Sequence, residues 1–409
     1  MRVLYFMNHV DQGGAALALY DLIIELKKIH DDYYPIVVTG KKNRLNEMLN
    51  EIGVENYFAE FKNFMSSYKR PFFLTKIALL VRYEIGKYRG IKQIEDVIDF
   101  KRIDIIHSNL ERIDIGAILA AKYGIVHFWH IREHAAIYSG FISHKVVTTR
   151  KVDFNLISVK ENPIKYMNDF DLMSVKDNYF IAISESVKRE WVQKGLSQDK
   201  IILVYDGIRE ELYNGTFGKK EKNCRYSNNN ILNMVFLGGY CKEKGQEEFI
   251  KALLQLPSEK QALVHVDFFG NGEEGYITHI KELAKHLLKK DVISINSYEP
   301  NISSKLHGYD VGINCSEAEG FGRVTVEYMM AGLCSLVSNT GANPEIIDDK
   351  LNGVMYMKNN VDDLKNKILF LLDNPKVCRE YGFVARVKAI NEFSMRKHAK
   401  TIYELYKNA

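Results

Sequence analysis

The chain of 409 residues is long enough for two or three domains with sizeable cores, and its 46% hydrophobic and 26% charged residues are ordinary globular values. Seven prolines argue against extensive disorder, and a net charge of +4 is too small to indicate nucleic acid by itself. The start of the chain passes quickly into polar residues, and no apolar run is long enough to span a bilayer. The five cysteines lack CxxC spacing, which is typical of free thiols in a reducing compartment. We therefore expect a cytoplasmic protein without a signal peptide, an anchor or a nucleic-acid partner.

Short β-branched or aromatic runs alternate with longer amphipathic segments, a pattern that favours α/β architecture with parallel sheets. In the first half we predict strands at Val3–Met7, Tyr34–Thr39, Ile103–His107, Val126–His130, Tyr179–Ile183 and Ile201–Tyr205. The helices predicted between them are Ala16–Lys28, Asp114–Tyr123 and Ser186–Gly195.

The second half repeats this alternation. The predicted strands are Met234–Leu237, Val264–Phe269, Val292–Ile295, Val311–Cys315 and Ser335–Ser338, followed by a turn into an edge strand over Lys350–Tyr356. The predicted helices are Gln246–Leu256, Tyr276–Leu288, Val324–Gly332 and Val361–Leu372. Two doubly wound domains follow from this order, with a ligand expected between them at the carboxyl ends of the strands.

A polar stretch at 213–230, rich in Gly and Asn and without periodicity, is the expected linker. We therefore expect an N-terminal Rossmann-like domain over residues 1–212 and a C-terminal Rossmann-like domain over 231–390, with 391–409 as a separate final segment.

Near the N-terminus, Gly13 and Gly14 follow a strand and enter a helix. Adjacent glycines allow a ligand to approach the backbone closely and let N–H groups point at an anion. A plain strand-to-helix turn explains the pattern equally well.

Histidines end two neighbouring predicted strands, His107 in one and His130 in the next. Parallel strands deliver such side chains to one edge of the sheet, where a cleft would be lined. An isolated histidine is more often structural, but its position favours His130 as a functional residue. His127 lies earlier in its strand and is expected to be structural.

After the linker, Gly238 and Gly239 end a buried strand, and Lys244 stands just before the next helix. A lysine in that place can neutralise a diphosphate leaving group. The alternative is a solvated lysine, of which Lys242 is an example.

The block 316–332 joins a buried strand, a Gly-Phe-Gly turn and the start of a helix. Helix N-termini carry unpaired N–H groups and partial positive charge, so they bind phosphate well. Glu319 and Glu327 lie eight positions apart around that turn, where carboxylates can accept hydrogen bonds from the vicinal hydroxyls of a ribose or a hexose. Arg323 adds positive charge, and the combination predicts a nucleotide-sugar site.

Two further signals compete with this interpretation. The D-x-D pattern at Asp169 and Asp171 is typical of metal-dependent nucleotide-sugar enzymes, but its surroundings read as loop or helix, and we expect no metal there.

The segment 62–92 carries eight Lys/Arg and one acid, Glu84, with interleaved aromatic residues. Such a segment is a candidate for contact with anionic lipid, and an ordinary helix with a basic face is the alternative.

Together these motifs resemble family 4 of the GT-B glycosyltransferases, which are retaining, metal-independent enzymes that use nucleotide sugars. The E-x7-E block from Glu319 to Glu327, the Gly238 to Gly245 turn and the segment 338–347 carry the resemblance in the second half. The first half is similar through looser motifs, at 13–15, 104–109 and 129–133. The resemblance implies a GT-B fold, α/β with two Rossmann-like doubly wound domains facing across a cleft and a C-terminal helix over 391–409 crossing back to the first domain. The first domain would bind the acceptor and the second the nucleotide sugar.

The resemblance also implies roles for single residues. Glu319 would contact the hydroxyls of the transferred sugar, Glu327 the ribose, and His130 would lie near the anomeric carbon. The expected catalytic residues are His130, Glu319 and Lys244. The expected donor-binding residues are Gly13, Gly14, Gly238, Gly239, Lys244, Glu319, Gly320, Phe321, Gly322, Arg323, Val324 and Glu327.

The chain departs from the family in two places. Many members have arginine where this chain has Gly239, so Arg323 is expected to supply that charge. A second histidine common in the family is Asn109 here, which weakens a catalytic role for the His107 strand.

We therefore expect a retaining transferase that moves a hexose from a nucleotide sugar to a glycan or lipid-linked glycan acceptor. The expected nucleotide is UDP, and the expected process is cell-surface polysaccharide or glycolipid synthesis. No cofactor and no metal are expected. A nucleotide-sugar epimerase of the same shape and a non-catalytic sugar-nucleotide-binding protein are the alternatives.

Overall fold

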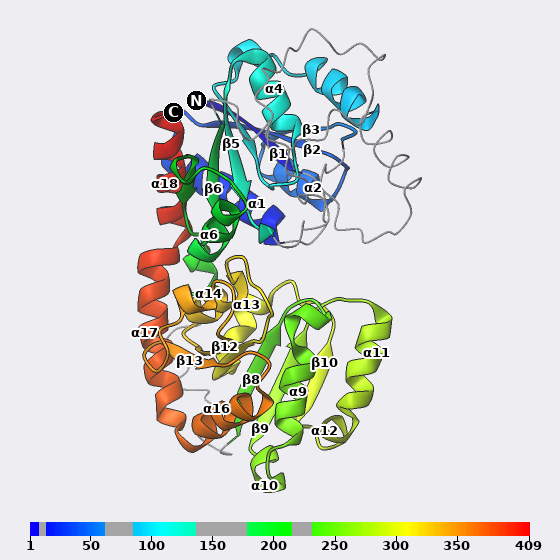
Figure 1. Cartoon of the computed structure of the whole chain (residues 1–409), viewed down its shortest axis with the longest axis vertical. Helices are drawn as coiled ribbons and strands as arrows, with labels where there is room; N and C mark the ends of the chain where they lie inside the picture. Colours follow the sequence, from blue (N-terminus) through cyan, green and yellow to red (C-terminus); the bar gives the residue numbers. More distant parts are fainter. Residues whose placement is uncertain (8–13, 62–84, 136–177, 215–230) are drawn as a thin grey trace. The chain divides into compact units, whose positions relative to one another are not determined.

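The computed structural model describes residues 1–7, 14–61, 85–135, 178–214 and 231–409, and the chain divides into two units. Unit 1 comprises Met1–Val204 and Ala399–Ala409, and unit 2 comprises Tyr205–His398. Both chain termini therefore belong to unit 1 (Figure 1). None of the helices in these described ranges is both long and apolar enough to cross a bilayer.

Within its described residues, unit 1 contains a parallel sheet in the order β3-β2-β1-β4-β5-β6-β7. The strands are β1 Arg2–Met7, β2 Tyr34–Thr39, β3 Glu55–Phe58, β4 Ile105–Ser108, β5 Val126–Ile131, β6 Asn178–Ala182 and β7 Ile201–Leu203. The helices are α1 Gly14–Ile29, α2 Arg44–Glu51, a helix over 85–95, α4 Ile115–Tyr123 and α6 Glu185–Gln193. The order reverses direction between β1 and β4, which places a topological switch point there.

Unit 2 contains a second parallel sheet in the order β10-β9-β8-β11-β12-β13. Its strands are β8 Leu232–Leu237, β9 Val264–Phe269, β10 Ile293–Asn296, β11 Val311–Asn314, β12 Cys334–Ser338 and β13 Gly353–Tyr356. The helices are α9 Gln246–Leu254, α10 Ser258–Gln261, α11 Glu274–Leu283, α12 Lys285–Lys289, α13 Ile302–Lys305, α14 Arg323–Met330, α15 Asn343–Ile346, α16 Val361–Asp373 and α17 Pro375–Phe393. The switch point of this sheet lies between β8 and β11.

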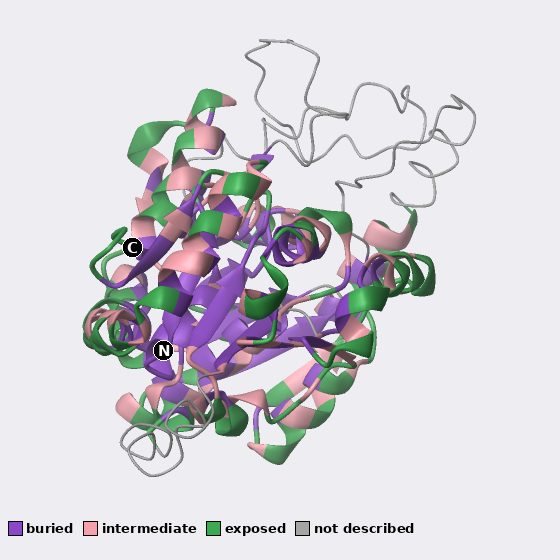
Figure 2. Cartoon of the chain, turned by 90° about the horizontal axis from the view of Figure 1, so that it is seen from below, coloured by how far each residue is buried: buried purple, intermediate pink, exposed green. Residues whose placement is uncertain are grey.

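Each sheet is buried between helices, as its nearly continuous apolar strands require. Figure 2 shows the strands as the buried layer, while the helices expose their outer faces. In unit 2, apolar residues of α9, α11, α12 and α16 form one core with the sheet. Helices α14 and α17 contact β12, and α14 also contacts β11.

The last helix, α18 Met395–Lys407, begins in unit 2, and from residue 399 onward the chain belongs to unit 1. The expected return of the C-terminal helix to the first domain is confirmed. The expected class, two parallel-sheet Rossmann-like α/β domains, is also confirmed.

The structure contains elements that the sequence pattern did not predict. Strand β3 is a four-residue sheet edge without a fully buried position, and α2 is a short helix beside it. Helix α17 buries the small residues Gly382, Ala385 and Ala389, whereas Phe383 and Val387 are exposed, so it lacks the large-apolar stripe that marks a helix. The single helix expected over 276–288 is divided at Ala284 into α11 and α12.

Candidate active site

The carboxyl ends of β8 and β11 meet at the switch point of the unit 2 sheet. A glycine turn and a short 3-10 helix, Lys242–Lys244, follow β8, and the turn that leads into α14 follows β11. Ligands of doubly wound sheets bind in the crevice that forms at this place, because the flanking connections leave in opposite directions. The fold therefore gathers both predicted motifs of the second half at one edge.

Lys244 and Glu319, the two residues predicted from separate motifs, are in direct contact. Lys244 Nζ donates to Glu319 Oε1 at 2.6 Å, and Ser316 Oγ donates to the same oxygen at 2.5 Å. The side chains of Lys244 and Glu319 are 35% and 16% exposed. A partly desolvated, charge-assisted cluster of this kind is well ordered, and it can still be reached by a ligand.

The backbone around Lys244 is held by a glycine. Gly245 ends the 3-10 helix in the left-handed region with φ 76°, and a Cβ there would lie 2.2 Å from the carbonyl oxygen of Cys315. The turn after β8 therefore packs directly against the end of β11, which only glycine permits. Gly238 lies along the stem of Lys244, whose Cδ would be 3.8 Å from a Cβ at that position.

Glu319 is fixed through its main chain. Its carbonyl oxygen accepts a hydrogen bond from Ala342 N at 3.0 Å, and Gly341, with φ 57°, packs against its backbone. A Cβ on Gly341 would lie 2.4 Å from Glu319 N. The segment after β12 therefore determines where the Glu319 carboxylate stands.

A buried network of small polar side chains supports the turn, and sequence reasoning assigned it no role. Asn314 at the end of β11 donates to Thr325 Oγ1 at 2.9 Å, and Ser338 at the end of β12 donates to the Ser316 carbonyl at 2.8 Å. Thr340 donates to that carbonyl at 2.8 Å. The signal was present in the sequence, since a buried strand that ends in Asn or Ser brings polar groups to the sheet edge.

A buried ion pair lies behind the same turn. Lys358, which follows β13, donates to Glu248 Oε2 at 2.5 Å and to the Cys315 carbonyl at 2.9 Å. The two side chains are only 10% and 11% exposed. Burial raises the pKa of the neighbouring Cys315 thiol to about 12, so this cysteine is an inert core residue.

Helix α14 begins at Arg323, directly after Gly322, which has φ 82°. Arg323 Nε lies 3.3 Å from Glu327 Oε1, one turn later, and these side chains are 18% and 19% exposed. The Phe321 side chain is buried against Tyr205 and Phe393, with ring centroids 6.2 and 5.7 Å away. Phe321 anchors the turn through its ring, which leaves its backbone for any contact with a ligand.

The remaining predicted positions of unit 2 are Gly239, Gly320 and Val324. Gly239 is exposed, and its carbonyl oxygen accepts from Gln246 Nε2 at 2.8 Å. Gly320 and Val324 flank the Phe321–Arg323 turn and are half-buried. This edge of unit 2 thus combines two cationic side chains, a helix N-terminus and two carboxylates, a set that suits a ligand with phosphates and hydroxyls.

In unit 1, His130 near the end of β5 is buried and packs on His107 of β4, with ring centroids 5.4 Å apart. Arg132 Nη2 lies 3.5 Å from His130 Nδ1. Because arginine only donates, Nδ1 is the acceptor, and a neutral His130 carries its proton on Nε2. Gly14 is exposed at the start of α1.

Asn109, where the resemblance led us to expect histidine, has a structural explanation in this chain. Its Oδ1 accepts from Arg132 Nε at 3.2 Å and from Arg132 Nη2 at 3.0 Å, and its Nδ2 donates to the Ala15 carbonyl at 2.9 Å. Asn109 thus orients a buried guanidinium and ties it to the first turn of α1. Arg132 lies within the 129–133 motif, from which no role was predicted for it, and its burial beside His130 makes it part of the candidate site.

His127 is structural, as predicted. Its Nε2 pairs with Ser108 Oγ at 2.9 Å and its Nδ1 with Asn178 Oδ1 at 2.8 Å. Burial lowers the pKa of His127 to about 3, against a smaller opposing effect of the Asn178 hydrogen bond. This ring remains neutral at physiological pH.

Several predictions fall outside the described residues. These are Gly13, the part of the basic segment over 62–84, the D-x-D pattern at Asp169 and Asp171, and the linker over 215–230.

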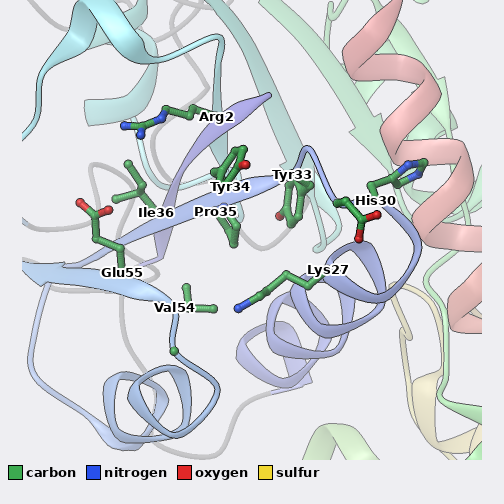
Figure 3. A pocket seen from close by; sticks show the side chains of 11 residues that line it. Arg2, Lys27, His30, Tyr33, Tyr34, Pro35, Ile36, Val54 and Glu55 are labelled. Atoms are coloured by element: carbon green, nitrogen blue, oxygen red, sulfur yellow. The ribbon is translucent and has the colours of Figure 1, made fainter.

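A pocket of about 370 Å³ lies at the amino edge of the unit 1 sheet, where β1, β2 and β3 begin (Figure 3). Its lining includes Arg2, Lys27, His30, Tyr33 and Glu55. None of the predicted site residues lines this pocket, and it lies at the opposite edge from His130.

Residues 219–387 match the family model of glycosyl transferases group 1. An uncharacterized glycosyltransferase of Methanocaldococcus jannaschii is 23% identical over 312 residues, which cover 73% of this chain and 76% of that protein. N-acetyl-alpha-D-glucosaminyl L-malate synthase of Bacillus anthracis is 24% identical over 228 residues, which cover 55% of this chain and 58% of that protein.

The solved structure of HepE from Anabaena in complex with UDP-glucose superposes with a TM-score of 0.73 at 18% identity and covers both chains completely. The chain accordingly has the GT-B fold of such neighbours. The match over residues 219–387 identifies that part of the chain as a group 1 glycosyl transferase domain.

Proposed function

We propose that the protein is a retaining glycosyltransferase that moves a hexose from a nucleotide diphosphate sugar, with UDP as the nucleotide, to a glycan or lipid-linked glycan. The observation that carries the proposal is the contact of Lys244 with Glu319 at 2.6 Å, next to the N-terminus of α14. It combines a cation for a diphosphate with a carboxylate for sugar hydroxyls. The Methanocaldococcus jannaschii relative is named a glycosyltransferase, and the HepE structure holds UDP-glucose.

In this proposal the donor lies along the carboxyl edge of the unit 2 sheet. Glu327 accepts hydrogen bonds from the ribose hydroxyls, and Glu319 from hydroxyls of the transferred sugar. The backbone N–H groups of the Phe321–Arg323 turn and the Lys244 ammonium bind the diphosphate. We also propose that Gly13 and Gly14 serve donor binding and that His130 is a catalytic residue.

The chemistry that we propose is a front-face transfer. The bond from the anomeric carbon to the diphosphate oxygen breaks, the acceptor oxygen attacks from the same face, and the leaving oxygen takes the acceptor's proton. Charge grows on the diphosphate in the transition state, where Lys244 and the helix N-terminus stabilise it most. These groups provide the cationic charge, so we propose that the enzyme needs no metal or other cofactor.

We further propose that the acceptor belongs to cell-surface polysaccharide or glycolipid synthesis, and that the enzyme works in the cytoplasm at the inner face of the membrane. The described part of the basic segment supports a peripheral contact, because Ile85 and Tyr88 on the helix over 85–95 are 49% and 57% exposed beside Lys87, Arg89 and Lys92. The four cysteines in the described ranges are free thiols, in keeping with a reducing compartment.

The test is incubation with radiolabelled UDP-sugars, preceded by thermal unfolding with UDP, GDP, ADP and dTDP to choose the nucleotide. A ligand that prefers the native state raises the Tm. Release of UDP with transfer to an added acceptor or with slow hydrolysis supports a transferase. An isomerised donor indicates an epimerase, and binding without turnover indicates a binding protein. Either of these two results overturns the proposal.

A further inference from the structure

Three tyrosine hydroxyls and a histidine form a continuous buried chain in unit 1. Tyr33 OH donates to Tyr5 OH at 2.7 Å, Tyr5 OH lies 3.2 Å from Tyr406 OH, and Tyr406 OH lies 2.5 Å from His107 Nδ1. Tyr406 comes from α18, near the end of the protein, and all four side chains are buried. These hydrogen bonds link α18 to His107, the histidine on which His130 packs.

The donor of each of these hydrogen bonds can be derived. Burial raises the pKa of all three phenols above the ordinary tyrosine value, so each carries one proton to donate. Tyr33 donates its hydroxyl proton to the Tyr5 oxygen. Within the described residues the Tyr5 hydroxyl bonds to Tyr33 and Tyr406, and either oxygen of the Tyr5–Tyr406 pair could donate. Because a buried hydroxyl proton without an acceptor is costly, we assign the Tyr5 proton to the Tyr406 oxygen. Tyr406 must then donate to His107 Nδ1, which fixes a neutral His107 as the Nε2–H tautomer.

The sheet register explains why this tautomer matters for His130. Tyr5, His107 and Phe128 are paired across β1, β4 and β5, so their side chains lie on one face of the sheet. The Tyr406 ring packs edge-on against His107 and Phe128, with centroids 5.9 and 5.2 Å away. His130 follows Phe128 by two positions on the same face and rests against the His107 ring.

We infer that Tyr406 is a positioning residue of the site: its hydroxyl fixes the tautomer and the ring orientation of His107, and His107 in turn holds His130. The inference rests on the proposed function, in which His130 is a catalytic residue. It gives the returning C-terminal helix a role at the reacting centre in addition to packing.

The experiment compares Tyr406→Phe with Tyr403→Phe in the full-length protein. Tyr403 lies on the same helix, stacks on His30 and has its hydroxyl 2.7 and 2.8 Å from the two carboxylate oxygens of Asp32. Its substitution removes a hydrogen bond from α18 without touching His107. Thermal unfolding shows whether both variants are folded to a similar degree.

The first measurement is the ¹⁵N spectrum of histidine-labelled protein, which reports the tautomer of His107 without any need for turnover. We expect wild type and Tyr403→Phe to give the Nε2–H pattern and Tyr406→Phe to lose it. An unchanged tautomer in Tyr406→Phe overturns the inference, whatever substrate the enzyme takes.

The second measurement is the kinetics of sugar transfer. We expect Tyr406→Phe to lower kcat about tenfold with little change in the donor KM, since a small displacement of a catalytic group impairs the reacting geometry. Equal losses in both variants would show that α18 acts only through stability and would overturn the inference. If the wild-type protein transfers no sugar while the tautomer result holds, the proposed function fails and the hydrogen-bond chain stands.

Discussion

Lys244 and Glu319 lie 75 positions apart in the chain, and their charged groups are 2.6 Å apart at the switch point of the unit 2 sheet. In this arrangement the carboxylate already neutralises the lysine. In the proposed function, a donor diphosphate would compete for the ammonium, while the sugar hydroxyls would bind the carboxylate. The pair would then couple recognition of the sugar to recognition of the leaving group.

Replacing Lys244 by methionine keeps the length of the side chain and removes its charge. If the ammonium stabilises charge that develops on the leaving diphosphate, as proposed, Lys244→Met should lower kcat about 10²–10³-fold. Steady-state kinetics measure this, with a sugar donor of the nucleotide that thermal unfolding has selected. Lys242→Met is the matched control, since Lys242 is exposed on the same 3-10 turn, and it should behave as wild type. Equal activity of both variants would contradict the role of Lys244.

Replacing Glu327 by alanine should act mainly on donor binding. Charged hydrogen bonds contribute about 1.5–3 kcal/mol, so losing those to the ribose should raise the donor KM about 10- to 100-fold with a smaller change in kcat. The ion pair with Arg323 is partly exposed and contributes at most about 1 kcal/mol, so the variant should fold. Glu317→Ala removes an exposed carboxylate of the same block and should leave the KM unchanged. A normal KM in Glu327→Ala would remove it from the ribose site.

Gly341 offers a test of the turn that carries Glu319. A methyl group there would meet the Glu319 backbone at 2.4 Å, and its φ of 57° is strained for alanine. We expect Gly341→Ala to cost about 1–3 kcal/mol of unfolding free energy and to reduce sugar transfer. Gly275→Ala, in α11 with open space around its Cβ position, should be neutral or slightly stabilising. Calorimetry and activity assays on both variants decide the question, and matching results for the two would refute the packing argument.

The sequence pattern predicted most of the fold because buried parallel strands are short, apolar and regularly spaced by helices. Strands β2 and β9 have the predicted bounds, and β13 is the predicted edge strand. Strand β3 was not predicted, because an exposed edge needs no continuous apolar run. Helix α17 was not predicted, because most of its buried residues are small and it lacks a stripe of large apolar side chains.

The candidate site was predictable where it relied on residue types with strong chemistry, such as Lys244 and Glu319. The supporting side chains could not be assigned from sequence, since Asn314, Ser338 and Thr340 acquire their meaning only when β11 and β12 end side by side. The hydrogen bond of Tyr406 with His107 spans 299 positions and has no local signature.

Asp267 on β9 is the centre of a polar cluster away from the candidate site. It accepts hydrogen bonds from His265 Nε2 at 3.2 Å, from Tyr309 OH at 2.7 Å and from Ser294 Oγ. Burial raises the pKa of Asp267, but these hydrogen bonds outweigh it and lower the pKa to about 2. The hydrogen bond to Asp267 in turn raises the pKa of His265, against the opposing effect of burial.

The cluster predicts how stability depends on pH. Because the folded-state pKa of Asp267 lies below its ordinary value of 3.8, its stabilisation is present above that value and is lost as the pH falls through about 2. The raised pKa of His265 acts in the opposite sense, so its stabilisation is present below 6.5 and is lost as the pH rises through the raised value. The side chains of His265 and Asp267 are 24% and 22% exposed, so solvent screens part of their interaction. We expect Asp267→Asn to cost about 1 kcal/mol, or about 2–4 °C in the Tm of a unit of this size. The Tm of the variant should fall less steeply than that of wild type between pH 4 and pH 2. In this window Asp267 becomes protonated in the unfolded chain before it does so in the folded one.

Asp373→Asn is the control, because its carboxylate is 55% exposed in a surface pair with Lys260, and it should retain the wild-type slope. Parallel slopes for Asp267→Asn and wild type would show that the cluster contributes nothing to acid stability.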